Sequence, residues 1–376
     1  MQNLRMPNYL KDYKELWEND PKAANMKWFK NAKMGLFIHY GLYTALGKNE
    51  WVQYFDKIPI DKYENLADNF SPHNFDADYI TDLALEANMS YVTMVTCHHD
   101  SFCLWDSKTE PFNSMNYCKR DLVREMIEQC NKKGLAFFPY YTFMLNWRNP
   151  WFVNHEEYNL ARPHYSDRPA QYKYKNKEDF SKYIDYILNC MFELLDNYGP
   201  VAGMWLDLIA TWYALGPEMI PIEDIYNKLR KRQEHILISW KQGATGTEDF
   251  CSTEQYFHSL EDKAFMYGGE AARVRAKHAF EKNRQKHGEV SATIQKDSWS
   301  FSAFGKHRTD DYIYNMLGHA MENNCNLCLN IGPMADGSIH PKQAEALKNL
   351  GKRVRENGFP KKGSIDFQSE TLVPEA

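Results

Sequence analysis

The chain has 376 residues, 25% of them charged, and a formal net charge of −5 at pH 7. This length suits one large domain or two ordinary ones, and the acidic balance argues against nucleic acid or an anionic membrane as the main partner. No apolar run is long enough to cross a bilayer, so no membrane span is predicted.

Aromatic residues make up 15% of the chain, which is typical of an aromatic core and also of a site that stacks on sugar rings. The eight cysteines are scattered singly, apart from Cys325 and Cys328. That pair has no second cysteine pair and no histidine at ligand spacing, so we expect buried thiols there, not a zinc site or a disulfide.

The first half of the chain alternates helical periodicity with short apolar or β-branched runs. Helices are expected over residues 9–31, 76–88 and 121–133, strands over 33–41, 90–96 and 135–141, and an irregular loop over 42–65. Pro139 lacks the N–H that a central strand needs, so the third strand is expected to carry a bulge.

The second half continues this alternation. Strands are expected over residues 201–207, 235–239, 248–254, 289–294 and 326–331, and helices over 179–198, 222–233, 308–322 and 341–355. About eight repeats of strand and helix predict an α/β fold, a (β/α)8 barrel in a single domain.

The expected organisation has three parts. A helical segment over residues 1–32 packs on the barrel, the barrel spans 33–358, and a short polar tail occupies 359–376. Residues 1–7 lack the apolar segment of a signal peptide. The chain as given therefore predicts a cytoplasmic protein, or a periplasmic or secreted one if a leader has been removed.

Polar side chains follow several of the predicted strands. They are His39, His98, His99, Tyr141, Asp207 and a carboxylate near Glu254. The carboxyl ends of barrel strands meet at one rim, where catalytic groups collect. Each residue also has a structural alternative, and for Asp207 this is to cap the helix that follows.

Two kinds of chemistry suit this set. In one, His39, His98, His99 and Asp207 hold a metal ion for hydrolysis, but no motif with ligand spacing supports it. In the other, a carboxylate pair hydrolyses a glycoside, and histidines, a tyrosine and tryptophans hold the sugar. The ring-rich rim with Glu50 and Trp51 favours the second, for which neither a metal nor a cofactor is expected.

Several blocks resemble the retaining α-L-fucosidase family of glycoside hydrolases. The segment from Trp28 to Gly41 is similar to the opening block of that family. Further similar blocks are Asn49-Glu50-Trp51, His98-His99-Asp100-Ser101-Phe102, Lys119 to Val123, Tyr140-Tyr141, Trp205-Leu206-Asp207, and 326–337.

The resemblance implies a distorted (β/α)8 barrel that hydrolyses α-L-fucosyl residues of oligosaccharides or glycoconjugates with retention. Asp207 matches the nucleophile, and Glu254 matches the acid/base, with Glu248 and Asp249 nearby as alternatives. The mechanism then needs Asp207 ionised, Glu254 protonated, and the two carboxyls about 5–5.5 Å apart. The residues that match sugar contacts are His39, Glu50, Trp51, His98, His99, Tyr141 and Trp299.

The sequence also departs from the family. Lys241 stands where a sugar-binding arginine is expected and is also expected to contact the sugar, although it cannot make the same bidentate contact. Leu208 and Ser101 replace the usual glycines, Leu206 replaces a phenylalanine, and no C-terminal β-sandwich is expected after the barrel. These departures leave open an exo-glycosidase of L-galactose-like sugars or a glycan-binding barrel that has lost turnover. No oligomeric state is predicted.

Overall fold

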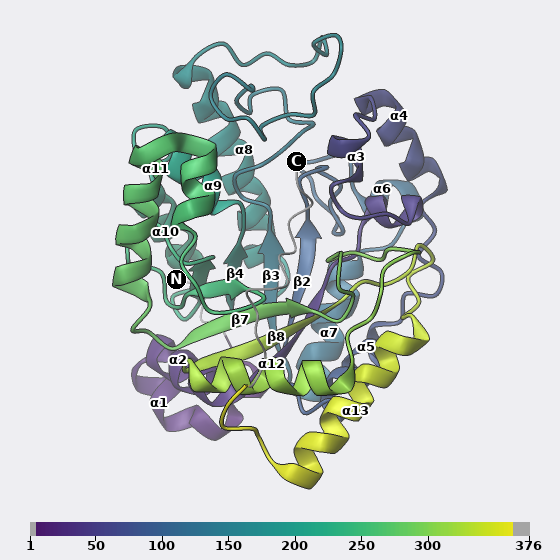
Figure 1. Cartoon of the computed structure of the whole chain (residues 1–376), viewed down its shortest axis with the longest axis vertical. Coiled ribbons are helices and arrows are strands. Elements are labelled where there is room, and N and C mark those ends of the chain that lie inside the picture. The colour runs from purple at the N-terminus through teal and green to yellow at the C-terminus, as the bar shows by residue number, and fades with distance from the viewer. Residues whose placement is uncertain (1–4, 364–376) are drawn as a thin grey trace.

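Eight parallel strands curl into a nearly closed barrel in the computed structural model, which describes residues 5–363 (Figure 1). Their order around the barrel is β5-β4-β3-β2-β1-β8-β7-β6, as a (β/α)8 fold requires. The predicted fold class is therefore confirmed. The strands are β1 (Met34–Ile38), β2 (Tyr91–Cys97), β3 (Ala136–Tyr141), β4 (Gly203–Leu206), β5 (Leu237–Trp240), β6 (Ser252–Glu254), β7 (Gly288–Thr293) and β8 (Cys325–Ile331).

The barrel is distorted where β5 meets β6, because the two strands that end the order share no ladder. Two backbone hydrogen bonds bridge them: the N–H of Asp249 donates to the Ile238 carbonyl at 2.8 Å, and that of Ser252 to the Lys241 carbonyl at 2.7 Å. The carboxylate of Asp249 also accepts from the N–H of Ile238 at 2.8 Å. A few local contacts therefore replace a continuous strand pairing at this junction.

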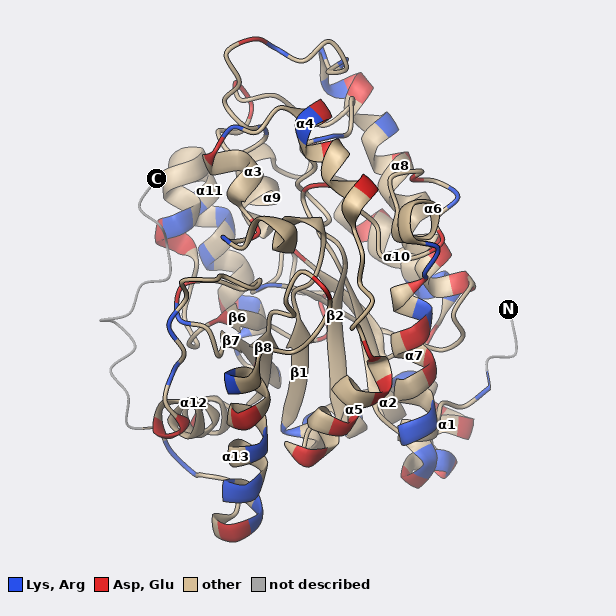
Figure 2. Ribbon diagram, turned by 90° about the vertical axis from the view of Figure 1, so that its right-hand side faces the viewer, with Lys and Arg blue, Asp and Glu red and all other residues tan. Residues whose placement is uncertain are grey.

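Helices surround the strands, and their outward faces carry most of the charged residues, while the strands are largely uncharged (Figure 2). The longer ones are α2 (Pro21–Ala32), α5 (Ala77–Glu86), α7 (Leu122–Lys133), α8 (Lys177–Asp196), α10 (Ile222–Arg232), α11 (Glu261–Asn283), α12 (Asp310–Glu322) and α13 (Pro341–Asn357). Shorter ones are η1 (Asn8–Tyr13), α1 (Lys14–Asn19), α6 (Ser114–Cys118) and α9 (Ile209–Leu215). Within residues 5–363, none is both long and apolar enough to span a membrane.

Three local expectations need correction. The loop expected over 42–65 contains η2 (Leu42–Leu46), α3 (Val52–Phe55) and α4 (Ile60–Glu64), followed by η3 (Asn65–Asn69). The helix expected over 9–31 is divided, because Asp20 caps a new helix by accepting from the Ala23 N–H at 2.9 Å. The bulge expected at Pro139 in β3 is found instead in the neighbouring strand β2, where the register of the β2–β3 pairing shifts between Val95 and Cys97.

The long helix α11 was not predicted from the sequence. Its middle contains Gly268 and Gly269, whose backbone angles are non-helical, with φ of +66° at Gly269. This kink interrupts the helical periodicity, and the stripe that follows it consists of the alanines Ala272, Ala276 and Ala279, which give a weak apolar signal.

Aromatic rings fill the amino-terminal end of the barrel, which α2 covers. Phe29 of α2 lies with its ring centroid 4.4 Å from that of Phe250. Tyr91 lies beside Gly35, where a Cβ atom would be 2.1 Å from the tyrosine ring. The interior is thus closed at this end, and any opening to solvent must lie at the carboxyl ends of the strands. The outer parts of the expected terminal segments, residues 1–4 and 364–376, lie outside the described residues.

Candidate active site

Asp207 follows β4 and points into the carboxyl-terminal end of the barrel. Trp205 faces the barrel interior, and a residue two positions later on a strand faces the same side. The hydroxyl of Tyr140 donates to Asp207 Oδ2 at 2.5 Å, and the N–H of Leu208 donates to Oδ1 at 2.5 Å. Leu208 occupies the cap position of α9, and no side-chain cap bond is made there. The alternative role of Asp207 as a helix cap is therefore not supported.

Lys241 joins Asp207 to Glu254. Its ammonium Nζ lies 3.1 Å from Asp207 Oδ1 and also donates to Glu254 Oε1. The side chains of Lys241 and Asp207 are 8% and 12% exposed, while that of Glu254 is 29% exposed. The ion pair is therefore enclosed on the Asp207 side and reaches solvent on the Glu254 side.

This arrangement differs from the expected protonation state of Glu254. Burial alone raises the pKa of Glu254, but the attraction of Lys241, with smaller contributions from Lys263 and His258, lowers it overall to about 2. Burial lowers the pKa of Lys241, and Asp207 and Glu254 together raise it above its usual value. Without a ligand, Glu254 is therefore a carboxylate paired with an ammonium, not the protonated acid expected from the sequence.

The two alternatives to Glu254 serve the fold. Glu248 is buried and accepts from the Ala244 N–H at 2.7 Å, the Tyr226 hydroxyl at 2.9 Å and Asn283 Nδ2 at 3.0 Å. Asp249 pairs with Lys22 of α2 at 2.7 Å besides closing the junction between β5 and β6. Among the three carboxylates, Glu254 is the one that the structure brings to Asp207.

His39 is held in place by Asn330. Its Nδ1 lies 2.6 Å from Asn330 Oδ1, and Asn330 Nδ2 donates to the Trp299 carbonyl at 2.6 Å. The rings of His39 and Trp299 lie with centroids 5.0 Å apart. Burial lowers the pKa of His39 to about 3, so its ring is neutral. Its other ring nitrogen, Nε2, takes no part in the contact with Asn330.

His98 and His99 bring further ring nitrogens to the same end of the barrel. His98 Nε2 lies 3.2 Å from the hydroxyl of Tyr140, and burial lowers the pKa of both histidines well below the usual value. Both ring nitrogens of His99 are buried without a hydrogen-bond partner, as is Nδ1 of His98. Buried polar atoms are normally hydrogen-bonded, so these nitrogens suit a polar ligand.

Glu50 and Trp51 complete one wall. Glu50 Oε2 accepts from the Ser300 N–H at 3.1 Å, and burial raises the pKa of this carboxyl. Trp51 lies with its ring centroid 4.7 Å from that of His99. Because Ser300 follows Trp299, the Glu50 contact ties this wall to the segment after β7.

Tyr141 is not among the residues that the structure brings together. It is buried on the other face of β3, with its ring centroid 6.3 Å from that of Trp105. Its neighbour Tyr140 faces the barrel interior and contacts Asp207 and His98. Alternation along β3 explains the error, since the interior face that carries Phe138 must also carry Tyr140.

Trp147 and Tyr43 were also missed. Trp147 lies with its ring centroid 3.8 Å from that of His99, and Tyr43 lies 5.6 Å from His98. The indole N–H of Trp147 and the hydroxyl of Tyr43 are buried without a partner. Tyr43 lies in the short helix η2 and Trp147 in a loop, so no strand alternation indicates the direction of either side chain.

A metal-binding set is not formed by these side chains. Over residues 5–363, no three His, Cys, Asp or Glu side chains are arranged to hold a metal ion.

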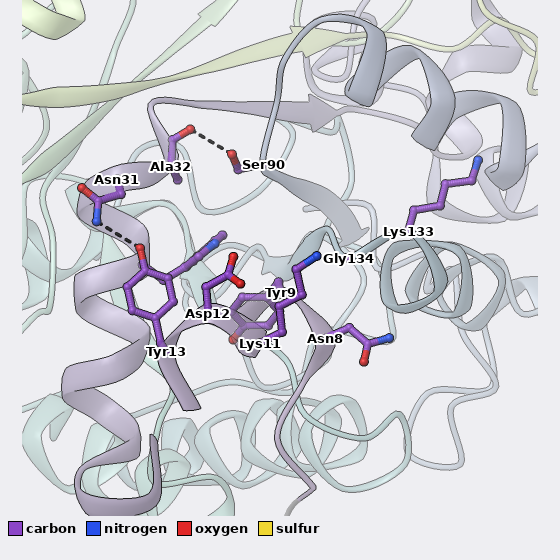
Figure 3. A pocket seen from close by; sticks show the side chains of 11 residues that line it. Asn8, Tyr9, Lys11, Asp12, Tyr13, Asn31, Ala32, Ser90, Lys133 and Gly134 are labelled. Carbon is purple, nitrogen blue, oxygen red and sulfur yellow. Dashed lines mark hydrogen bonds between the residues drawn. The ribbon is translucent and has the colours of Figure 1, made fainter. Parts of the chain in front are cut away.

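A separate hollow of about 300 Å³ lies at the opposite end of the barrel, lined by residues such as Tyr9, Trp28 and Gly134 (Figure 3). It contains none of the predicted site residues.

Comparison with known proteins identifies the family of this chain. The α-L-fucosidase family model matches residues 1–359. The chain belongs to the α-L-fucosidase family. The human plasma α-L-fucosidase is 23% identical over 405 residues, which cover 96% of this chain and 74% of the human protein. As a member of this family, the protein is a glycoside hydrolase.

Solved α-L-fucosidases share the fold. Isoenzyme 1 from Paenibacillus thiaminolyticus is 27% identical with a TM-score of 0.72, and the match covers 92% of this chain and 79% of that one. AlfC from Lactobacillus casei, solved in complex with its α-L-fucose product, is 28% identical with a TM-score of 0.72. That match covers 88% of this chain and 98% of AlfC.

Proposed function

We propose that this α-L-fucosidase releases terminal α-L-fucosyl residues by two displacements, with Asp207 as nucleophile and Glu254 as acid/base. Asp207 attacks the anomeric carbon while Glu254 gives a proton to the leaving oxygen. Glu254 then takes a proton from the water that releases fucose. The configuration at the anomeric carbon is retained.

One observation carries this assignment: Asp207 and Glu254 both contact the same ammonium. Two hydrogen bonds to a shared atom keep the nearest carboxyl oxygens within about 6 Å of each other. Retaining glycosidases place their carboxyls about 5–5.5 Å apart, whereas inverting ones leave about 6.5–9.5 Å for a water molecule. The shared ammonium is compatible with the shorter spacing, which retention requires.

The proposed sugar site consists of the buried groups around this pair. Neutral ring nitrogens of His39, His98 and His99 bond hydroxyls of the sugar, and Glu50 accepts from another. Trp51 and Trp299 cover apolar parts of the ring. Tyr140, which replaces Tyr141 in this scheme, fixes the orientation of Asp207 through its bond to Oδ2.

The proposal is tested with an aryl α-L-fucoside on the wild type and Asp207→Ala, each with and without azide. We expect turnover by the variant to fall on the order of 10³-fold or more, and azide to restore part of it. The restored product should be a fucosyl azide of inverted configuration, because azide enters from the face that the carboxylate has vacated.

Asn330→Ala provides a matched comparison, since it loosens His39 without touching either carboxyl. It should raise KM more than it lowers kcat, and azide should have no effect. If Asp207→Ala keeps full activity, Asp207 is not the nucleophile. A wild type that hydrolyses no α-L-fucoside would contradict the proposed substrate.

A further inference from the structure

The ammonium of Lys241 occupies the space in which the proposed reaction takes place. Nζ lies 3.1 Å from Asp207 Oδ1 and donates at the same time to Glu254 Oε1. In a double displacement, the anomeric carbon lies against the nucleophile and the leaving oxygen against the acid/base. Both atoms must therefore lie between the two carboxyls, where the ammonium now lies. A glycoside cannot bind in a reactive position until Nζ moves.

The movement must take place in the side chain of Lys241. Its backbone is fixed by the bond from the Ser252 N–H to the Lys241 carbonyl at 2.7 Å, and it adopts a φ of +48° that a non-glycine residue rarely has. The lysine stem, by contrast, is flexible, and Nζ lies 5.0 Å from the ring centroid of Trp205. In this scheme the stem rotates and carries the ammonium away while β5 and β6 stay in place.

We propose that Lys241 is a displaceable cation: it fills the reaction site of the free enzyme, the sugar displaces it, and Glu254 takes up one proton from solvent as the ammonium leaves. This inference rests on the proposed function. Lys241 is here a positioning residue, because it acts on the reaction through the charge of Glu254.

The charges around Glu254 give the reason for proton uptake. Five titratable groups interact electrostatically with Glu254: Lys241 after β5, Lys263 of α11, His258 of the β6–α11 connection, His39 after β1, and Glu50. Burial favours the protonated carboxyl, and Lys241 is the largest influence against it. When the ammonium withdraws and a neutral sugar takes its place, burial prevails and the carboxyl binds a proton. The exposed side of Glu254 gives that proton a path from solvent.

The proton balance closes over one turnover. Protonated Glu254 gives its proton to the leaving oxygen while the bond from that oxygen to the anomeric carbon breaks and the bond to Asp207 forms. The carboxylate then accepts a proton from water, whose oxygen displaces Asp207 from the sugar. When fucose departs, Lys241 returns and Glu254 releases that proton to solvent.

Isothermal titration of the wild type with L-fucose tests the uptake directly, because the heat of buffer ionisation counts the protons exchanged. Titrations at one mildly acidic pH in two buffers of different ionisation enthalpy should show uptake approaching one proton per sugar. Equal heats in both buffers, with fucose bound, would overturn the inference.

Lys241→Met and Lys241→Arg form a matched pair of variants. The methionine keeps the apolar stem without a charge, so uptake should fall to a small part of the wild-type value. The arginine keeps a cation next to Glu254 and should retain most of the uptake. If the methionine variant takes up as many protons as the wild type, another group is responsible.

A crystal structure of the wild type with L-fucose provides a test that does not depend on any variant folding. Nζ should then lie beyond hydrogen-bond distance from Glu254, and a bound sugar with Nζ still bridging both carboxyls would overturn the inference. An enzyme that hydrolyses aryl α-L-fucosides but shows neither uptake nor displacement refutes this inference alone. An enzyme that neither binds fucose nor hydrolyses its glycosides refutes the proposed function and this inference together.

Discussion

Two glutamates on neighbouring strands of the barrel, Glu289 and Glu254, have opposite environments. Glu289 of β7 accepts from the Trp205 indole at 2.8 Å, the Ser252 hydroxyl at 2.8 Å and the Tyr91 hydroxyl at 2.6 Å. Burial raises its pKa, and these neutral donors offset the effect only in part. Glu254 of β6 instead faces the charged Lys241, and its pKa falls to about 2.

The pairing of β6 with β7 places the two glutamates one layer apart. Ser252 pairs with Glu289, and Glu254 pairs with Ser291 two residues further along. Glu289, the lower carboxyl, lies further inside the barrel. It has a complete set of protein donors and no access to solvent, which suits a structural role. Glu254, the upper carboxyl, lies nearer the rim. It has the movable Lys241 as its single partner and an exposed side, which suits proton exchange. The partners of the carboxyl and its access to solvent together distinguish the proposed reactive glutamate from the structural one.

The largest expected effect concerns the upper carboxyl. Glu254→Gln should lower kcat on the order of 10³-fold for a fucoside with a poor leaving group, because that oxygen must be protonated as it leaves. A good leaving group needs little protonation, so its first step should be affected much less. The comparison of kcat for the two substrates checks this, and equal losses would contradict the acid role. Glu248→Gln is the control and should leave kcat of the folded enzyme near the wild-type value.

The lower carboxyl should matter for stability. Glu289→Leu leaves the donors on Trp205, Ser252 and Tyr91 without an acceptor, which should lower the free energy of unfolding by about 3–5 kcal/mol. Glu289→Gln still offers an acceptor oxygen and should lower it by about 1 kcal/mol. Urea denaturation measures both values. A leucine variant as stable as the wild type would show that this polar layer is not needed.

The two carboxyls should give opposite dependences of stability on pH. The pKa of Glu254 is lowered in the folded state, so its ion pair stabilises the fold above about pH 4.5, and this is lost as the pH falls toward about 2. The pKa of Glu289 is raised from 4.5, so its contribution is fully present below that pH and is lost as the pH rises through its folded-state pKa. Against the wild type, Glu254→Gln should therefore gain about 1–2 kcal/mol in relative stability in acid, and Glu289→Gln should gain as the pH rises above 4.5. Urea midpoints across the pH range measure this, and parallel curves for the variants would contradict it.

The smallest effect concerns the backbone next to Glu254. Gln255 has a φ of +62°, and its side-chain Oε1 is buried without a partner. Gln255→Gly relieves both and should raise the free energy of unfolding by about 0.5–1 kcal/mol while lowering kcat, because Glu254 is held less firmly. Ser291→Gly, on the paired strand, relieves no such strain and should only destabilise. Greater stability with unchanged kcat would mean that the strained backbone does not position the acid.

Much of this site could be predicted from the sequence, because strand alternation is simple. Trp205 in the interior implies Asp207 at the rim, and Phe37 implies His39 in the same way. The same rule applied to Phe138 selects Tyr140 over Tyr141. Residues outside the strands, such as Trp147 in a loop and Tyr43 in η2, gave no such signal.

The charge state of the site could not be predicted, because it depends on a distance that no sequence pattern encodes. Lys241 is recognisable as a departure from the family, but its contact with two carboxyls requires the chain to turn sharply after β5. Leu208 and Ser101, which replace the usual glycines, have φ of +63° and +70°. At both positions this chain therefore adopts, without glycine, a backbone conformation that favours glycine.

The missing ladder between β5 and β6 has a consequence for how such a site can diversify. Lys241 and Glu254 lie on opposite sides of that junction, which rests on two backbone hydrogen bonds and the carboxylate of Asp249. Insertions or deletions over residues 242–248 can change the spacing of this ion pair without moving any paired strand out of register. Loop grafting at this junction is therefore a route to new leaving-group preferences on an otherwise unchanged barrel.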